Sequence, residues 1–288
     1  MTVPPRPDAS RRVHASEKTS GPRRVLIWAA LGVIAVVTVM ALFPQLLATH
    51  DPLRTDVRAA LEAPSVGHLF GTDQSGRDVF SRVVHGAGRS VGIGLLATAL
   101  ALVTGLVLGA LSGKAPRAVD ATVMRVTDVL LAFPEFLVAL VVVAILGPGP
   151  TNVAIAVTIA AVPVYVRLAR VQTRSLALAE HVEAARILGV PPMKAFVRHV
   201  VPGVLGSLSV LATIGIGSSI LAAAGLSFLG LGPTEPAPEW GLMLSGGRNV
   251  LGTAWWIALF PGVAITLTVV SATIVGRSLR ARVEGRLS

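Results

Sequence analysis

The chain of 288 residues contains no cysteine, and only 14% of its residues are charged. The absence of cysteine excludes disulfide bonds and thiolate metal sites, although it does not decide the compartment. The scarcity of charge is more informative, because 53% of the residues are hydrophobic and the mean hydropathy is +0.73. A soluble globule of this size would expose far too much apolar surface. The composition therefore predicts an integral membrane protein.

Hydrophobic runs long enough to cross a bilayer recur along the chain. About 20 apolar residues suffice, since each helical residue advances about 1.5 Å through roughly 30 Å of hydrocarbon. The runs predict an all-α protein with six transmembrane helices. The expected helices cover Val25 to Ala48, Ser90 to Gly113, about Met124 to Leu146, Val153 to about Leu168 (shortened by Pro163), Val204 to about Leu231, and Ala254 to Val275.

Basic residues indicate how these helices are oriented. With a cytoplasmic N-terminus, the inside segments hold 19 Lys and Arg residues and the outside segments hold six. The positive-inside rule then predicts an N-in, C-in topology. The net charge of +10 is explained by this orientation, and no nucleic-acid partner is expected.

The predicted topology divides the chain into five parts. Residues 1–24 form a basic cytoplasmic tail that we expect to be disordered, and residues 25–48 form a first membrane helix that is retained as an anchor. Residues 49–89 form an external loop, and residues 90–278 form a core of five helices. Residues 279–288 form a second cytoplasmic tail.

A short helix is expected in the external loop, lying along the outer face. Ser75 and Asp78 make an S-x-x-D capping box that opens it, and Gly86 and Gly88 are expected to end it. This helix either braces the bundle or helps to receive a partner outside the membrane.

Proline and glycine mark two further features. The outer segment from Pro233 to Met243 predicts a stiff acidic loop that either gates a pathway or caps the fifth helix, with Trp240 as an interfacial anchor. Gly105, Gly109 and Gly113 recur at every fourth residue of the second span. They predict close helix packing, within the chain or against a second subunit.

A charged stretch, Glu180 to Pro202, interrupts the apolar runs on the cytoplasmic side. Apolar residues at helical spacing, Leu178, Val182, Ala185 and Leu188, predict one helix, which a left-handed Gly189 would end. A second helix would start at Pro191 or Pro192. The low ridge at Ala184 and Ala185 suits a groove on another protein, although such a helix could also lie on lipid headgroups.

Particular residues of this stretch match a known pattern. Glu183, Ala184 and Ala185, then Gly189 after three intervening residues, and a closing Pro202 resemble the EAA loop of ABC importer permeases. Five further stretches, in order, are similar to the C-type membrane subunit of dipeptide, oligopeptide and nickel ABC importers. They are FGTDQSGRDVFSRV (70–83), DVLLAFPEFLVAL (128–140), LGPGPTNVAIAV (146–157), LSFLGLGPTEPAPEWGLML (226–244) and FPGVAITLTV (260–269).

The resemblance covers about residues 25–285, with two departures. Val201 stands where Leu usually precedes the closing proline, and Glu135 replaces a residue that is commonly small or apolar. The first departure is trivial, and the second leaves the lining of the pore open.

The resemblance implies a function and a set of partners. The loop at 175–202, between helices 4 and 5, would dock on an ATP-binding subunit and couple it to transport. The chain would form half of a translocation pathway for di- or oligopeptides in a bacterial plasma membrane, with nickel or another small solute as the alternative cargo. The implied partners are a homologous second permease subunit, two ATP-binding subunits, an external solute-binding protein and membrane lipid.

No nucleotide site is found in the chain itself. The nearest approach to a phosphate-binding loop runs from Gly109 to Lys114, but its glycine spacing is too short and Ala115 stands where Ser or Thr would bind magnesium. The six histidines show no metal-ligand spacing. We therefore expect no cofactor, metal or catalytic residue in this chain, with ATP and magnesium bound by partner subunits.

Charges inside the third predicted helix are costly in a membrane and should face water or protein. Arg125 and Asp128 are three residues apart and are expected to pair. Glu135 has no partner at helical spacing, so Glu135, with Asp128, is the candidate for the translocation path. These two carboxylates are about 10 Å apart along one helix, which argues against an intramembrane enzyme. A passive channel would not need the cytoplasmic helix pair.

Overall fold

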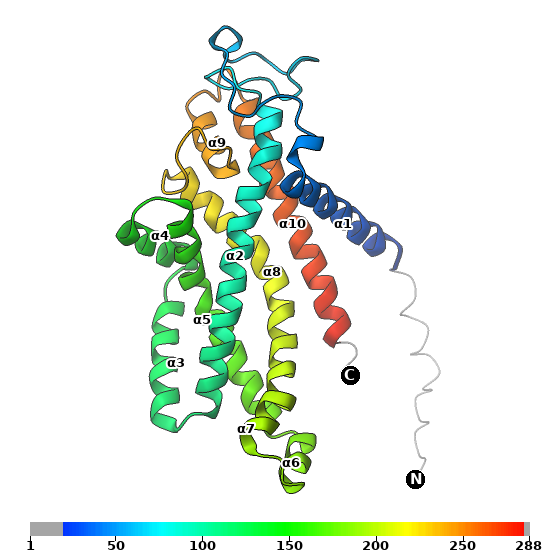
Figure 1. The fold of residues 1–288 in the computed structure, drawn as a ribbon, viewed down its shortest axis with the longest axis vertical. Coiled ribbons are helices and arrows are strands. Elements are labelled where there is room, and N and C mark those ends of the chain that lie inside the picture. The colour runs from blue at the N-terminus through cyan, green and yellow to red at the C-terminus, as the bar shows by residue number, and fades with distance from the viewer. Residues whose placement is uncertain (1–19, 285–288) are drawn as a thin grey trace, which may run out of the picture.

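The computed structural model describes residues 20–284, and these residues form helices and loops without a β-strand. Most of the predicted N-terminal tail, residues 1–19, and the last four residues of the predicted C-terminal tail lie outside the described residues. Long helices α2, α5, α8 and α10 run along the length of the molecule, while α1 crosses beside them at an angle (Figure 1). The prediction of an all-α fold is confirmed for the described part of the chain.

Within residues 20–284, five helices are long and apolar enough to cross a membrane, or six spans are present if one bent pair counts as a single span. The long helices are α1 (Ser20–Leu42), α2 (Val79–Lys114), α5 (Pro150–Ala177), α8 (Val201–Phe228) and α10 (Trp256–Glu284). The shorter elements are the 3₁₀ turns Pro44–Leu46 and Val57–Ala59, α3 (Arg117–Leu131), α4 (Glu135–Leu146), α6 (Glu180–Ile187), α7 (Pro192–Ala195), the π-turn Phe196–Val200 and α9 (Trp240–Arg248).

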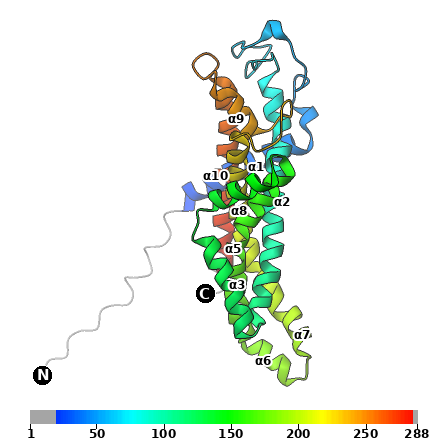
Figure 2. The ribbon, with the colours of Figure 1, turned by 90° about the vertical axis from the view of Figure 1, so that its left-hand side faces the viewer.

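The two ends of the bundle differ. Residues 43–78 and α9 gather at one end, which we call the loop end, and α6 and α7 form the opposite end, which we call the tip (Figures 1 and 2). The segment that carries the EAA pattern therefore lies at the far end of the molecule from the long loops.

The third predicted span is not one straight helix. The expected helix from about Met124 to Leu146 divides into α3 and α4, which meet at an angle of 96°. Pro134 explains the break, because it has no N–H to continue the hydrogen bonds of α3, and it instead caps the start of α4. The expectation of an unbroken third helix was wrong.

The predicted short external helix is also corrected. Asp78 alone caps the helix start, with its carboxylate accepting the Ser81 N–H at 2.7 Å, and the helix continues as α2 to Lys114. The glycines expected to end it instead allow close packing. A Cβ added to Gly86 would lie 3.0 Å from the Trp240 ring, and one added to Gly88 would lie 3.2 Å from a carbonyl of α1.

Proline and glycine act differently elsewhere in the bundle. The first helix ends at Leu42 and not at Ala48, because Pro44 disfavours helix in the residue before it. In contrast, α5 continues through Pro163 to Ala177, as proline is tolerated in packed membrane helices. The glycine repeat of α2 packs within the chain, since a Cβ on Gly109 would lie 2.5 Å from that of Ala169.

Candidate functional site

The tip begins with the short helix α6, which contains the EAA pattern. Gly189 follows it with φ +80°, and the Val190 N–H donates to the Ala185 carbonyl at 3.0 Å. This bond pattern closes a helix through a left-handed residue. The predicted glycine stop is therefore confirmed, and Ala185 supplies the carbonyl that anchors the turn.

The second part of the tip is continuous with a membrane helix. α7 starts at Pro192, and a π-turn joins it to α8, with the Val201 N–H donating to the Phe196 carbonyl. Pro202 lies in the first turn of α8 and does not close the segment as the pattern suggested. A π-turn before a proline gives the ring room inside a helix that would otherwise break. The tip is thus continuous with α8 along the chain.

The predicted apolar stripe of α6 is divided between two surfaces. Val182 and Ala185 are buried, whereas Leu178 and Leu188 are exposed, together with Glu183 and Ala184. The helix turns its buried face to the bundle and leaves apolar side chains outside. The exposed apolar residues of the tip, here called the tip patch, are Leu178, Ile187, Leu188, Met193 and Val197.

The buried face of the tip is seated on the long helices. Val182 and Val200 belong to one core cluster with Tyr165 of α5 and Leu208 of α8. Beside this cluster, the Lys114 ammonium lies 5.0 Å from the centre of the Phe196 ring. The tip is therefore a packed extension of α5 and α8.

An ionic cluster fixes α3 beside the tip end of α5. The Asp120 carboxylate accepts bonds from Arg170 at 2.5 and 2.7 Å, from Arg174 at 2.7 Å and from the Ser112 hydroxyl at 2.7 Å. From the sequence, Arg170 and Arg174 were interpreted only as basic residues that indicate the orientation of the helices in the membrane. Asp120 was the available clue, because it is an acid within a basic segment, but the arginines lie 50 and 54 residues away.

The embedded charges of the predicted third helix are arranged differently from expectation. Asp128 pairs with Arg167 of α5, and not with Arg125 of its own helix. Asp128 thus acts as a second tie between α3 and α5.

Glu135 lies at the bend between α3 and α4. It is the first residue of α4 and is exposed, and no hydrogen bond or ion pair joins it to another of residues 20–284. The positive end of the helix dipole stabilises a carboxylate in the first turn. The bend therefore separates the two candidate pathway residues, with Asp128 tied to α5 on one side and Glu135 exposed on the other.

A helix pair carrying the EAA pattern and seated at one end of an apolar bundle suggests a transporter subunit, and comparison with known proteins supports this. The family model described as "Binding-protein-dependent transport system inner membrane component" matches residues 105–288. The chain belongs to this family. With its long apolar helices, the permease is a multi-pass protein of a bacterial inner membrane.

Similar proteins share most of their length with the permease. It is 40% identical over 261 residues to the dipeptide transport system permease protein DppC of Alkalihalophilus pseudofirmus, covering 90% of this chain and 86% of that protein. It is 41% identical over 248 residues to the probable D,D-dipeptide transport system permease protein DdpC of Escherichia coli, with coverage of 86% and 83%. It is 42% identical over 260 residues to the glutathione transport system permease protein GsiD of E. coli, with coverage of 90% and 86%.

At the loop end, a second ionic cluster joins two loop segments of the permease. Arg77 donates to Asp73 at 2.7 Å and to Glu235 at 2.7 Å, and the buried Arg82 reaches the same Glu235 carboxylate at 3.5 Å. Burial opposes the charge on Arg77, but Asp73 and Glu235 outweigh it and raise the pKa of the guanidinium. The loop before α2 is thereby held against the loop before α9.

Trp240 corrects a further expectation. It is fully buried, and its indole N–H donates to the Val83 carbonyl at 2.8 Å, so its ring packs inside the protein and does not face lipid headgroups. The neighbouring Glu239 caps α9 and also accepts a bond from Ser90 of α2 at 3.0 Å. This part of the segment packs α9 into the bundle.

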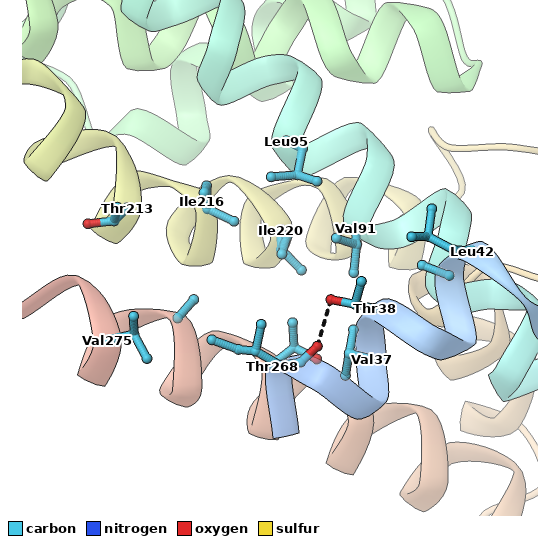
Figure 3. A pocket seen from close by; sticks show the side chains of 13 residues that line it. Val37, Thr38, Leu42, Val91, Leu95, Thr213, Ile216, Ile220, Thr268 and Val275 are labelled. Atoms are coloured by element: carbon cyan, nitrogen blue, oxygen red, sulfur yellow. Dashed lines mark hydrogen bonds between the residues drawn. The ribbon is translucent and has the colours of Figure 1, made fainter. Parts of the chain in front are cut away.

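An apolar groove of about 430 Å³ lies between α1, α2, α8 and α10 (Figure 3). Its lining is aliphatic apart from three hydroxyl groups. Thr38, Thr213 and Thr268 each donate that hydroxyl to a carbonyl of their own helix at 2.7 Å. The residues that line the groove carry no charge, so the groove offers a charged peptide no ion pair.

Proposed function

We propose that the permease forms half of the translocation pathway of an ABC importer for di- or oligopeptides. In this proposal the chain crosses the membrane six times, with α3 and α4 as one bent span and both termini in the cytoplasm. A homologous permease supplies the other half of the pathway, and an external binding protein delivers the solute at the loop end. Membrane lipid surrounds the remaining apolar surface.

The observation that carries the proposal is the tip. A short helix pair exposes a compact set of aliphatic side chains, although it lies beyond the ends of the membrane helices. Clustered exposed apolar residues on a soluble surface indicate a protein contact. In the proposed assembly this contact is made with an ATP-binding subunit, and the coupling residues are Glu183, Ala184, Ala185, Gly189 and Pro202.

The continuity of the tip with α8 supports a mechanism. ATP and magnesium would bind two partner subunits, and closure of these subunits would displace the tip. Because α7, the π-turn and α8 form one continuous helical segment, the displacement would tilt α8 within the bundle. The pathway would then open outward to take solute, and hydrolysis would reset it. The permease itself would perform no covalent chemistry.

The identities of the similar proteins favour a peptide cargo. Their names specify dipeptides, D,D-dipeptides and glutathione, which share a free amine and a carboxylate. Glu135 offers an exposed carboxylate at the bend of the proposed third span, where it could attract the amine of a passing peptide. Nickel or another small solute is the alternative cargo, and the three names do not favour it.

The proposal is tested by placing a charge in the tip patch. We expect Leu188→Asp to abolish co-purification of the ATP-binding subunits and ATP-driven uptake, because it would bury an unpaired carboxylate in the contact. Val66→Asp is the matched control, since Val66 is also a strongly exposed aliphatic residue, at the loop end. Retained association in Leu188→Asp, or its loss in both variants, would overturn the proposed docking role.

A further inference from the structure

Three potential metal ligands that are far apart in the sequence meet at the loop end. His50 follows the 3₁₀ turn after α1, His68 lies in the long loop, and Asp78 caps the start of α2. Each offers one ligand atom, and these atoms all lie within 4.8 Å of one another. The sequence showed no metal spacing because the residues are brought together only when the loop folds back onto α2.

Hydrogen bonds to neighbouring groups hold the cluster in place. Asp78 is anchored through Oδ2 to the Ser81 N–H, and the backbone N–H of His50 donates to the Ser81 hydroxyl at 3.0 Å. Nδ1 of His68 lies 2.9 Å from Oδ1 of Asp78, and Nδ1 of His50 lies 3.9 Å from Oδ2. Both imidazoles therefore face one fixed carboxylate.

These distances suit a shared ion. Zinc binds imidazole nitrogen and carboxylate oxygen at about 2.0–2.2 Å, so neighbouring ligand atoms in a tetrahedral site lie roughly 3.3 Å apart. The two imidazoles approach different oxygens of Asp78, at 2.9 and 3.9 Å, and one ligand atom from each of the three residues lies within 4.8 Å of the others, so a modest shift of the rings would place all three on one ion. Nδ1 of His68 contacts Asp78 and Nδ1 of His50 lies 3.0 Å from the Thr49 hydroxyl, with the two ring centres 4.8 Å apart.

The ligand types and their exposure narrow the kind of ion. Two imidazoles with one carboxylate suit zinc and its neighbours, while calcium and magnesium prefer oxygen ligands and copper(I) prefers sulfur. The Asp78 side chain is 1% exposed, and those of His68 and His50 are 21% and 40% exposed. The ion would thus reach the site from solvent, and water could complete its coordination.

We propose that His50, His68 and Asp78 bind a divalent transition metal ion of the zinc type at the loop end of the permease. The ion joins the end of α1, the outer loop and the start of α2 at one point. It fixes the loop that lies between the first two membrane helices. This role is independent of the cargo and of the docking contact at the tip.

The test measures zinc binding by the full permease, purified through a tag that contains no histidine and first stripped with a chelator. After equilibration with Zn²⁺ and gel filtration, we expect the wild type to retain about one zinc ion per chain, as three protein ligands plus water make one site. His50→Gln and His68→Gln should each weaken binding about tenfold or more. His85→Gln is the matched control, because His85 lies on α2 and bonds to the Ser81 carbonyl, outside the cluster.

Three results would overturn the proposal. They are no retained zinc in the wild type, unchanged affinity in His50→Gln and His68→Gln, or an equal loss in His85→Gln. Cobalt(II) gives a second measurement on the wild type alone, so the test does not depend on how the variants fold. Visible absorption bands of four- or five-coordinate cobalt are expected, and their absence would also count against the site.

Discussion

The Asp120 cluster should control how α3 is held against α5. In Asp120→Asn the side chain keeps its size but loses its charge, while the two arginines keep theirs. The Asp120 side chain is 9% exposed, Arg170 is 21% exposed and Arg174 is 45% exposed. The substitution therefore leaves one nearly buried guanidinium without its counter-charge.

The expected magnitude follows from this burial. Removing one partner of a fully buried ion pair costs about 3–5 kcal/mol. Because Arg174 is almost half exposed and can be solvated, we discount this to about 2–3 kcal/mol. That range corresponds to a roughly 30- to 150-fold change in the equilibrium constant for packing of α3 against α5.

The Asp128–Arg167 pair provides the matched control. It joins the same two helices, but its side chains are 55% and 50% exposed. A half-exposed pair contributes less than a buried one, on the order of 1 kcal/mol or less where water reaches it. Asp128→Asn should therefore have a much smaller effect than Asp120→Asn, although both remove one aspartate charge.

Distances between spin labels provide the assay. The natural chain has no cysteine, so cysteines introduced at Val126 of α3 and Val171 of α5, both exposed, can be labelled specifically. We expect a narrow distance distribution in the parent, a broad one in Asp120→Asn and a nearly unchanged one in Asp128→Asn. Equal broadening in the two variants, or none in Asp120→Asn, would refute the argument from burial.

Three further predictions concern packing, cargo and the tip. Gly109→Ala should destabilise the permease by about 1–3 kcal/mol, since the new methyl meets the α5 backbone, whereas Gly92→Ala on the same helix faces open space and should leave the melting temperature unchanged. Glu135→Gln should slow uptake of cationic peptides into vesicles more than uptake of neutral ones, and equal uptake of both would remove Glu135 from the pathway. Gly189→Ala should cost about 1–2 kcal/mol through its φ of +80° and weaken association with the ATP-binding subunits. Gly206 also has open space where a Cβ would lie but is part of ordinary helical backbone, so Gly206→Ala should cause neither the loss of stability nor the weaker association. An equal effect of the two substitutions would show that backbone strain is not the cause.

Local patterns predicted much of the structure correctly. The apolar runs identified the long helices α1, α2, α5, α8 and α10, because the length of an apolar run depends on the sequence alone. The stop of α6 at Gly189 was also predictable, since few residues other than glycine adopt a left-handed backbone.

The prolines did not predict where helices end as reliably as Gly189 did. Pro134 divides the third predicted span, while Pro163 lies inside the unbroken α5 and Pro202 lies inside the helical segment that joins the tip to α8. All three lack the same N–H group, so the local chemistry is identical. Their different outcomes depend on the neighbouring helices and turns that accommodate the ring.

The sequence by itself determined that this chain is an apolar helical membrane protein with a charged helix pair, because hydrophobicity, glycine stops and helical spacing act over a few residues. Only the tertiary structure decided which distant groups meet. Asp120 finds Arg170 on another helix, and His50 and His68 converge on Asp78 through a folded loop. Charge pairing and metal-type geometry depend on distances of a few ångströms in space, and sequence separation does not encode those distances.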